Sequence, residues 1–144
     1  MRDPDFDLDD FLPYQFNIIA GRLSRGFAER YKARFGISIA EWRVVAHLHH
    51  SGAVSVREIH ERAHMDKSKI SRAAARLEAA GYISKRVSSV DRRLVELSLT
   101  QKGDAMMAEL VVLARKYQAQ IVELLGPDNA KVRDGINVLM HSRF

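Results

Sequence analysis

The sequence predicts a mainly helical protein with one small β-hairpin, an α+β fold. Apolar residues recur every three or four positions through most of the 144-residue chain, which is the period of one helix face. Capping residues and glycines divide these stretches into separate helices. Only residues 82–99 change to short strand-like runs around a polar, basic turn. The length favours one domain with a core of useful size.

The first two helices are expected near the N-terminus. Residues 16–35 carry an apolar stripe at helical spacing, and Gly36 follows as a C-terminal glycine should. Ser38 and Glu41 have the spacing of a capping box, which predicts a second helix that Gly52 closes.

Two shorter helices follow, joined by a tight turn. Ser55 and Glu58 repeat the capping spacing, and Asp66 is suited to cap the next helix, which Gly81 ends. A glycine is common at the turn between two such helices, but this chain has His64 there. A left-handed backbone is mildly costly for histidine, so this turn departs from the usual pattern.

Residues 82–87 and 94–99 are predicted to be strands, with residues 88–93 at the hairpin tip. The second strand alternates apolar and polar residues, as a half-buried strand does. Thr100 is then suited to cap a long apolar helix that stops at Gly126 and the following proline. A last helix completes the chain.

Composition and charge limit the possible functions. Residues 57–102 contain eleven Lys and Arg against six Asp and Glu, so this third of the chain carries the whole net charge of +5. A basic excess confined to one segment indicates a surface for a polyanion. The chain has no cysteine, which excludes disulfides and thiolate metal sites and fits a cytoplasmic location. No apolar run is long enough to span a bilayer, so no membrane partner is expected.

The helix over residues 66–81 is predicted to have one cationic side. Ile70, Ala73, Ala74 and Leu77 fall on the apolar side of a helical wheel, which should pack near Ile59. The opposite side carries short hydroxyls beside long cations and no acid. Such a side can enter a major groove, with Arg pairing to guanine and Lys or Ser contacting phosphates. The DNA-contacting candidates are Ser68, Lys69, Ser71, Arg72 and Arg76.

The hairpin tip offers a second DNA-contacting element. Asp91, Arg92 and Arg93 place a carboxylate beside two guanidiniums. The carboxylate can orient an arginine and so reduce the rotamer entropy that it loses on entering a narrow A·T-rich minor groove. A plain turn with a local ion pair is the simpler interpretation of this tripeptide alone.

The two ends of the chain are predicted to form a homodimer. The helical segments there are too apolar to lie alone on a surface, and a chain of this size has little material to cover them. Residues 1–37 and 100–144 are therefore assigned to dimerisation, and residues 38–99 to DNA binding.

Three segments and the spacing between them resemble the MarR family of winged helix-turn-helix regulators. These segments are residues 58–72, 76–81 and 91–103. The resemblance extends in element order over nearly the whole chain. It implies a winged helix-turn-helix with a dimerisation stem built from the terminal helices, which binds a pseudo-palindromic operator as a homodimer and acts as a repressor. It also implies that Arg93 enters the minor groove, held by Asp91, with Arg92 on the DNA backbone.

The same resemblance implies release from DNA by a small aromatic or anionic effector. The helix after Ser38 is expected at the junction of the dimerisation and DNA-binding regions. The candidate effector ligands on it are Trp42, Arg43 and His47. Core packing and ordinary surface charge are the simpler explanation for each residue taken alone.

Other functions find less support. His60 and His64 have the spacing of a helical metal-chelating pair, but no further ligand is evident, so no metal site or cofactor is predicted. No catalytic motif is present, and an enzyme is not expected. A winged-helix module that binds protein instead of DNA is the alternative, but it should expose large apolar residues where this chain has Lys and Arg.

Overall fold

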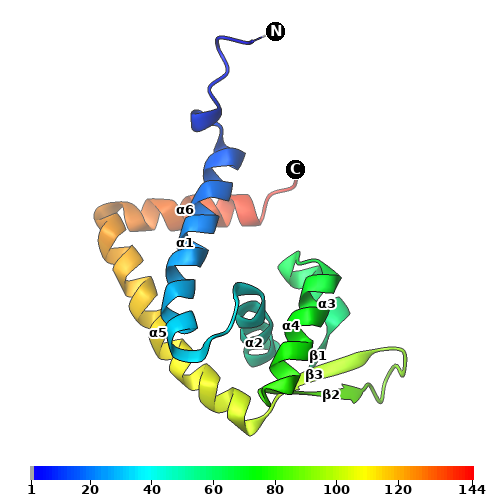
Figure 1. Cartoon of the computed structure of the whole chain (residues 1–144). Coiled ribbons are helices and arrows are strands. Elements are labelled where there is room, and N and C mark those ends of the chain that lie inside the picture. Colours follow the sequence, from blue (N-terminus) through cyan, green and yellow to red (C-terminus); the bar gives the residue numbers. More distant parts are fainter. Residues whose placement is uncertain (1) are drawn as a thin grey trace. The chain divides into compact units, whose positions relative to one another are not determined.

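The structure is a computed structural model that describes residues 2–144 (Figure 1). It contains two compact units, of which the first ends at Leu110 and the second comprises Val111–Phe144. The predicted class, mainly helical with a small hairpin, is confirmed. The predicted assignment of residues 38–99 to DNA binding and of the flanking segments to dimerisation stays a prediction.

The first long helix, α1, comprises Leu12–Phe35 and follows a short 3-10 helix, Leu8–Asp10. It begins four residues before the predicted start, since Pro13 lies in its first turn, where a proline is tolerated. Gly36 ends it with a φ of 68°, the left-handed conformation that glycine adopts readily.

The second helix, α2, comprises Ile39–Ser51 and has the predicted N-terminal cap. The Ser38 hydroxyl oxygen accepts a hydrogen bond from the Glu41 backbone N–H at 3.1 Å. The same hydroxyl donates to Glu41 Oε1, also at 3.1 Å. Gly52 ends α2 with a φ of 73°.

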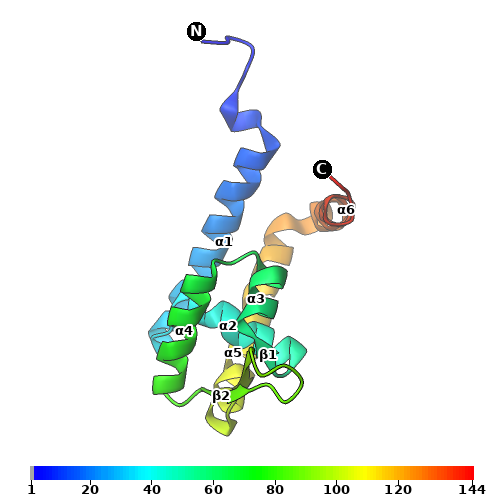
Figure 2. The ribbon, with the colours of Figure 1, turned by 90° about the vertical axis from the view of Figure 1, so that its right-hand side faces the viewer.

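Helices α3 (Val56–Ala63) and α4 (Lys67–Ala79) form the predicted helix-turn-helix. The Ser55 hydroxyl caps α3 by accepting from the Glu58 backbone N–H at 3.1 Å. Helix α4 packs against both α2 and α3. Figure 2, viewed from the side on which the hairpin of Figure 1 reaches out, has α3 and α4 in front of α1 and α2.

The sheet has three antiparallel strands in the order β1-β3-β2. Strands β2 (Ile83–Val87) and β3 (Val95–Leu99) are the predicted hairpin, and Lys85 pairs with Leu97 in their register. Strand β1, Val54–Ser55, was not predicted, because two residues between helices are too short to show an alternating pattern.

The hairpin extends beyond the core of the first unit. Ile83 and Leu97 are buried, but Val87 and Val95, which pair on the same face nearer the tip, are 57% and 43% exposed. The predicted half-buried alternation of the second strand therefore holds at Leu97 and is wrong at Val95. The tip lies outside the core and can contact a partner.

Helix α5, Gln101–Leu125, runs from the first unit into the second. The Thr100 hydroxyl caps it as predicted, accepting from the Gly103 backbone N–H at 3.1 Å. In the first unit α5 buries Met106, Met107 and Leu110. In the second unit it is followed by a 3-10 helix, Gly126–Asp128, and by α6, Asn129–Met140, which buries none of its residues.

None of the helices in residues 2–144 combines the length and the apolar character needed to cross a bilayer.

Candidate nucleic-acid interface

The turn before α4 is held by local hydrogen bonds. His64 has a φ of 52°, so the left-handed conformation expected at this position is present despite its side chain. The His64 N–H donates to the His60 carbonyl at 3.1 Å, and His60 Nδ1 lies 2.5 Å from the Met65 carbonyl oxygen. Asp66 then caps α4 by accepting from the Ser68 N–H at 3.2 Å.

Helix α4 has the two sides that its sequence predicts. Ile70, Ala73, Ala74 and Leu77 are at most 1% exposed, and they form the seam against α2 and α3. The other side is exposed along its length and bears Ser68, Lys69, Ser71, Arg72, Ala75 and Arg76. The helix therefore presents hydroxyls and cations to solvent while its apolar seam fixes its rotation.

The cations of this exposed side are not equivalent. Within residues 2–144 no hydrogen bond or ion pair engages the Lys69 ammonium or the Arg72 guanidinium. Arg76 differs, because its Nε donates to Glu41 Oε1 at 2.8 Å. Arg76 was predicted to contact DNA together with Lys69 and Arg72, because a partner 35 positions away is not evident from sequence spacing.

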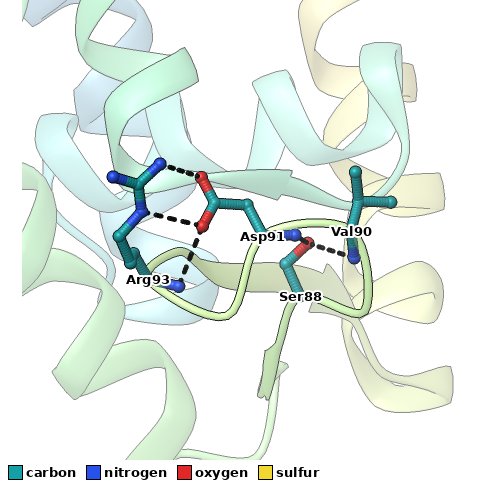
Figure 3. A network of polar contacts seen from close by, with 4 residues as sticks. All are labelled: Ser88, Val90, Asp91 and Arg93. Atoms are coloured by element: carbon teal, nitrogen blue, oxygen red, sulfur yellow. Dashed lines mark hydrogen bonds and ion pairs between the residues drawn. The ribbon is translucent and has the colours of Figure 1, made fainter.

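The hairpin tip, which we call the wing, comprises residues 88–94 and has a defined geometry (Figure 3). The Ser88 hydroxyl is buried and accepts from the backbone N–H groups of Val90 and Asp91, both at 3.2 Å. Across the loop, the Ser88 N–H donates to the Leu94 carbonyl at 2.9 Å. These bonds order a loop that would otherwise be free to fluctuate.

Within the wing, the Asp91 carboxylate and the Arg93 guanidinium form a bidentate ion pair (Figure 3). Arg93 Nε donates to one carboxylate oxygen at 3.1 Å and Nη2 to the other at 3.2 Å. These bonds, aided by the nearby positive charge of Arg57, lower the pKa of the Asp91 carboxyl. The Arg93 side chain is 90% exposed, so the guanidinium is oriented and still accessible. Arg92 is also exposed.

Lys102, a residue of the first turn of α5, contributes to the basic excess of residues 57–102, but its side chain reaches the C-terminal end of α4. Its ammonium donates to the Ala80 carbonyl at 2.6 Å and lies 4.7 Å from the centre of the Tyr82 ring. The Thr100 hydroxyl similarly donates to the Gly81 carbonyl at 2.6 Å. The start of α5 thus satisfies carbonyls at the end of α4, where a positive charge is favourable.

The geometry agrees with comparisons to known proteins. Residues 35–94 match the sequence model of the MarR family. The repressor MdtR of Bacillus subtilis is 32% identical over 90 residues, which are 62% of this chain and 58% of that protein. The regulator PrsX of Escherichia coli is 25% identical over 138 residues, covering 94% of this chain and 83% of PrsX. The crystal structure of a MarR/EmrR family regulator from Acinetobacter sp. ADP1 superimposes with a TM-score of 0.81 at 26% identity, covering 94% of this chain and 93% of that one.

This chain is similar to the MarR family in sequence over residues 35–94 and in fold over most of its length. The resemblance seen in the sequence is therefore confirmed, and so is the winged helix-turn-helix architecture. These relatives are named as transcriptional regulators, which agrees with the expectation of a regulator and not an enzyme. The alignment spans less than two thirds of MdtR. The roles of individual residues in this chain stay predictions.

The three candidate effector ligands have different environments in the structure. Trp42 packs into an aromatic cluster, with its ring centre 5.0 Å from that of Phe27 and 5.9 Å from that of Tyr31. Arg43 is exposed, and His47, one turn further along α2, is half-buried. Burial, followed by the charges of Arg62 and His50, lowers the pKa of His47. Packing thus accounts for Trp42, while Arg43 and His47 are available to a ligand.

Tyr31 is a polar residue within the apolar stripe predicted over residues 16–35. Its side chain is 0% exposed, and among the described residues 2–144 its hydroxyl is a buried group without a hydrogen-bond partner. Burial raises the pKa of Tyr31 to about 12, against a smaller lowering by the charge of Arg43. The sequence shows no signal for this, because a tyrosine on a helix stripe usually reaches a polar partner.

The histidine pair considered as a metal site has another role. His60 Nδ1 contacts the Met65 carbonyl, so the pair helps to shape the turn before α4. In the part of the chain that the structure describes, no three His, Asp or Glu side chains come together as a metal site would require.

Proposed function

We propose that this chain is a repressor that binds a pseudo-palindromic operator as a homodimer. The observation that carries the proposal is α4, whose buried seam turns Ser68, Lys69, Ser71 and Arg72 to solvent. A helix with small hydroxyls beside long cations fits the major groove, where arginine can pair with guanine. The name of MdtR as a repressor supports the direction of regulation.

The wing supplies the second contact. We assign Arg93 to the minor groove, with Arg92 on the neighbouring backbone. The ion pair with Asp91 supports this assignment, because it orients the guanidinium before DNA is bound and so lowers the entropy lost on binding. A narrow A·T-rich minor groove has a strong negative potential that favours an inserted arginine.

Homodimerisation is supported in each unit separately. In the first unit, the N-terminal half of α1 exposes large apolar residues, including Phe16, Ile18 and Ile19 at 40–49%. In the second unit, α6 exposes apolar side chains along its length, among them Val138 at 65% and Met140 at 76%. Large exposed apolar side chains gathered on single elements are typical of an interface between proteins.

An effector is proposed to act next to the aromatic cluster of Phe27, Tyr31 and Trp42. Arg43 could pair with an anionic group, and the unpartnered phenol of Tyr31 lies in the cluster beside Trp42. BpsR of Bordetella bronchiseptica, whose DNA binding is regulated by 6-hydroxynicotinic acid, has a similar fold, with a TM-score of 0.80 at 17% identity. A small aromatic acid is therefore the class of effector that we propose.

The proposal is tested by selecting DNA from a random pool with the full chain and footprinting the product. We expect an inverted repeat whose half-site centres lie about 10–10.5 base pairs apart, or a multiple of this spacing. The molecular mass in solution should be that of a dimer. A single asymmetric half-site would contradict the dimeric mode, and selection of no sequence would favour a protein-binding module.

A second prediction concerns the wing. Arg93→Ala should weaken binding to an operator with A·T-rich flanks several-fold more than binding to one with G·C-rich flanks, because the narrow groove attracts the guanidinium. Arg92→Ala is the matched control and should weaken both operators about equally, since a backbone contact carries no sequence information. Fluorescence anisotropy titrations give the four affinities. Equal losses for Arg93→Ala on the two operators would remove the minor-groove role.

A further inference from the structure

Among the cations of the exposed α4 side, Arg76 alone is bonded to another element within residues 2–144. Its Nε donates to Glu41 Oε1 at 2.8 Å, from the first turn of α2. The Arg76 side chain is 54% exposed, whereas that of Glu41 is only 11% exposed. The carboxylate is thus an internal anchor, and the guanidinium is fixed at one edge while the rest of it remains accessible.

Glu41 is itself held in place. Its Oε1 also accepts from the Ser38 hydroxyl at 3.1 Å, and its backbone N–H donates to the same hydroxyl. The carboxylate therefore has little freedom to follow a moving arginine. An Arg76 that stays paired must keep its Nε toward α2, which leaves its two Nη groups to contact DNA.

This arrangement restricts how Arg76 can read a base. A free arginine can present either the Nε edge or the Nη end of its fork to a paired acceptor. With Nε engaged, only the Nη end remains. Arg76 has also lost rotamer freedom before binding, so it loses less on contact with DNA than the unpaired Arg72 does.

We propose that Glu41 is a positioning residue for DNA recognition, which sets sequence discrimination by fixing Arg76. This inference rests on the proposed function. In this role Glu41 acts through Arg76 and not by contact with DNA. Because it is an acid in the basic DNA-binding region, its charge alone opposes binding to any DNA. Its positioning role and its charge thus have opposite effects, which makes the inference separable from a general effect on the fold.

The test measures affinity for the selected operator and for unrelated DNA of equal length, using the full chain. Glu41→Gln should lower the ratio of the two affinities about 5–10-fold, while affinity for unrelated DNA stays equal or rises because a negative charge is lost. A variant that was only misfolded would lose both affinities. Arg76→Ala should lower the ratio similarly, and adding Glu41→Gln to Arg76→Ala should cause no further loss.

Two further variants keep the test decisive. Glu61→Gln removes the acid of the exposed Arg57–Glu61 pair and should leave the affinity ratio unchanged. Arg76→Lys keeps the charge but lacks the fork, so it should lower the ratio even if Glu41→Gln fails to fold. The inference is overturned if Glu41→Gln leaves the affinity ratio unchanged. It is also overturned if Glu41→Gln lowers the ratio of the Arg76→Ala variant as much as it lowers that of the unaltered chain. Failure of the unaltered chain to discriminate any DNA would instead overturn the proposed function, and would be seen before any variant is made.

Discussion

Replacing Gly103 by alanine is expected to lower the free energy of unfolding by about 3 kcal/mol or more. A Cβ at this position would lie 2.0 Å from the Tyr82 carbonyl oxygen and 3.1 Å from a Leu99 methyl. The nearest obstacle is backbone, which cannot turn aside as a flexible side chain can. The contact also lies where the Thr100 N–H donates to the Tyr82 carbonyl at 3.0 Å, so relief of the clash would break the junction between β2 and α5.

Chemical denaturation of the full chain measures this effect, and Gly135→Ala is the matched control. Gly135 lies within α6, and a Cβ there would meet nothing within 4 Å. The control should stabilise the protein by about 0.5–1 kcal/mol, because alanine loses less backbone entropy than glycine in a helix. Equal stability of Gly103→Ala and the unaltered chain would show that the junction is looser than described.

Arg72→Ala is expected to reduce discrimination between the operator and unrelated DNA by about 1–3 kcal/mol, which is roughly 5–150-fold. The Arg72 guanidinium is exposed on α4, and no partner engages it in residues 2–144, so it is available to pair with a base edge. Lys69→Ala should differ in kind, because an ammonium on phosphate contributes charge without sequence information. It should weaken binding to both DNAs equally and reduce the slope of log affinity against log salt by about 1.

Titrations of both DNAs at several salt concentrations separate these roles. Lys32→Ala, which removes an exposed cation from the last turn of α1, is the control and should change neither quantity. If Arg72→Ala left the affinity ratio intact while Lys69→Ala changed it, the two residues would have exchanged roles. If neither variant changed any affinity, the assignment of this side of α4 to DNA would be wrong.

The parts of the fold that could be predicted are those fixed by neighbours in the sequence. The caps at Ser38, Ser55 and Asp66 depend on residues two or three positions away, and all three are present. The two sides of α4 follow from helical periodicity, which the buried seam confirms. The wing ion pair of Asp91 and Arg93 is likewise a local contact, and its geometry is as expected.

The parts that could not be predicted depend on contacts between distant segments. Arg76 meets Glu41 only after α2 and α4 pack together, so sequence spacing gave no sign that it differs from Arg72. Lys102 was counted in the basic excess of residues 57–102, because charge alone does not show that its ammonium faces the Ala80 carbonyl. Strand β1 needs β3 as its partner, and two residues carry no periodicity of their own.

The most direct test places a reporter on the exposed side of α4. Because the chain has no cysteine, Ser71→Cys creates a unique thiol that can carry a DNA-cleaving reagent. On the operator complex we expect strand cleavage centred in the major groove of each half-site, with two-fold symmetry. The same reagent on Lys116→Cys, an exposed position of α5, is the reference. If the Ser71→Cys conjugate left the bound operator uncut, or cut no more than the reference, α4 would not enter the groove and the account would be contradicted.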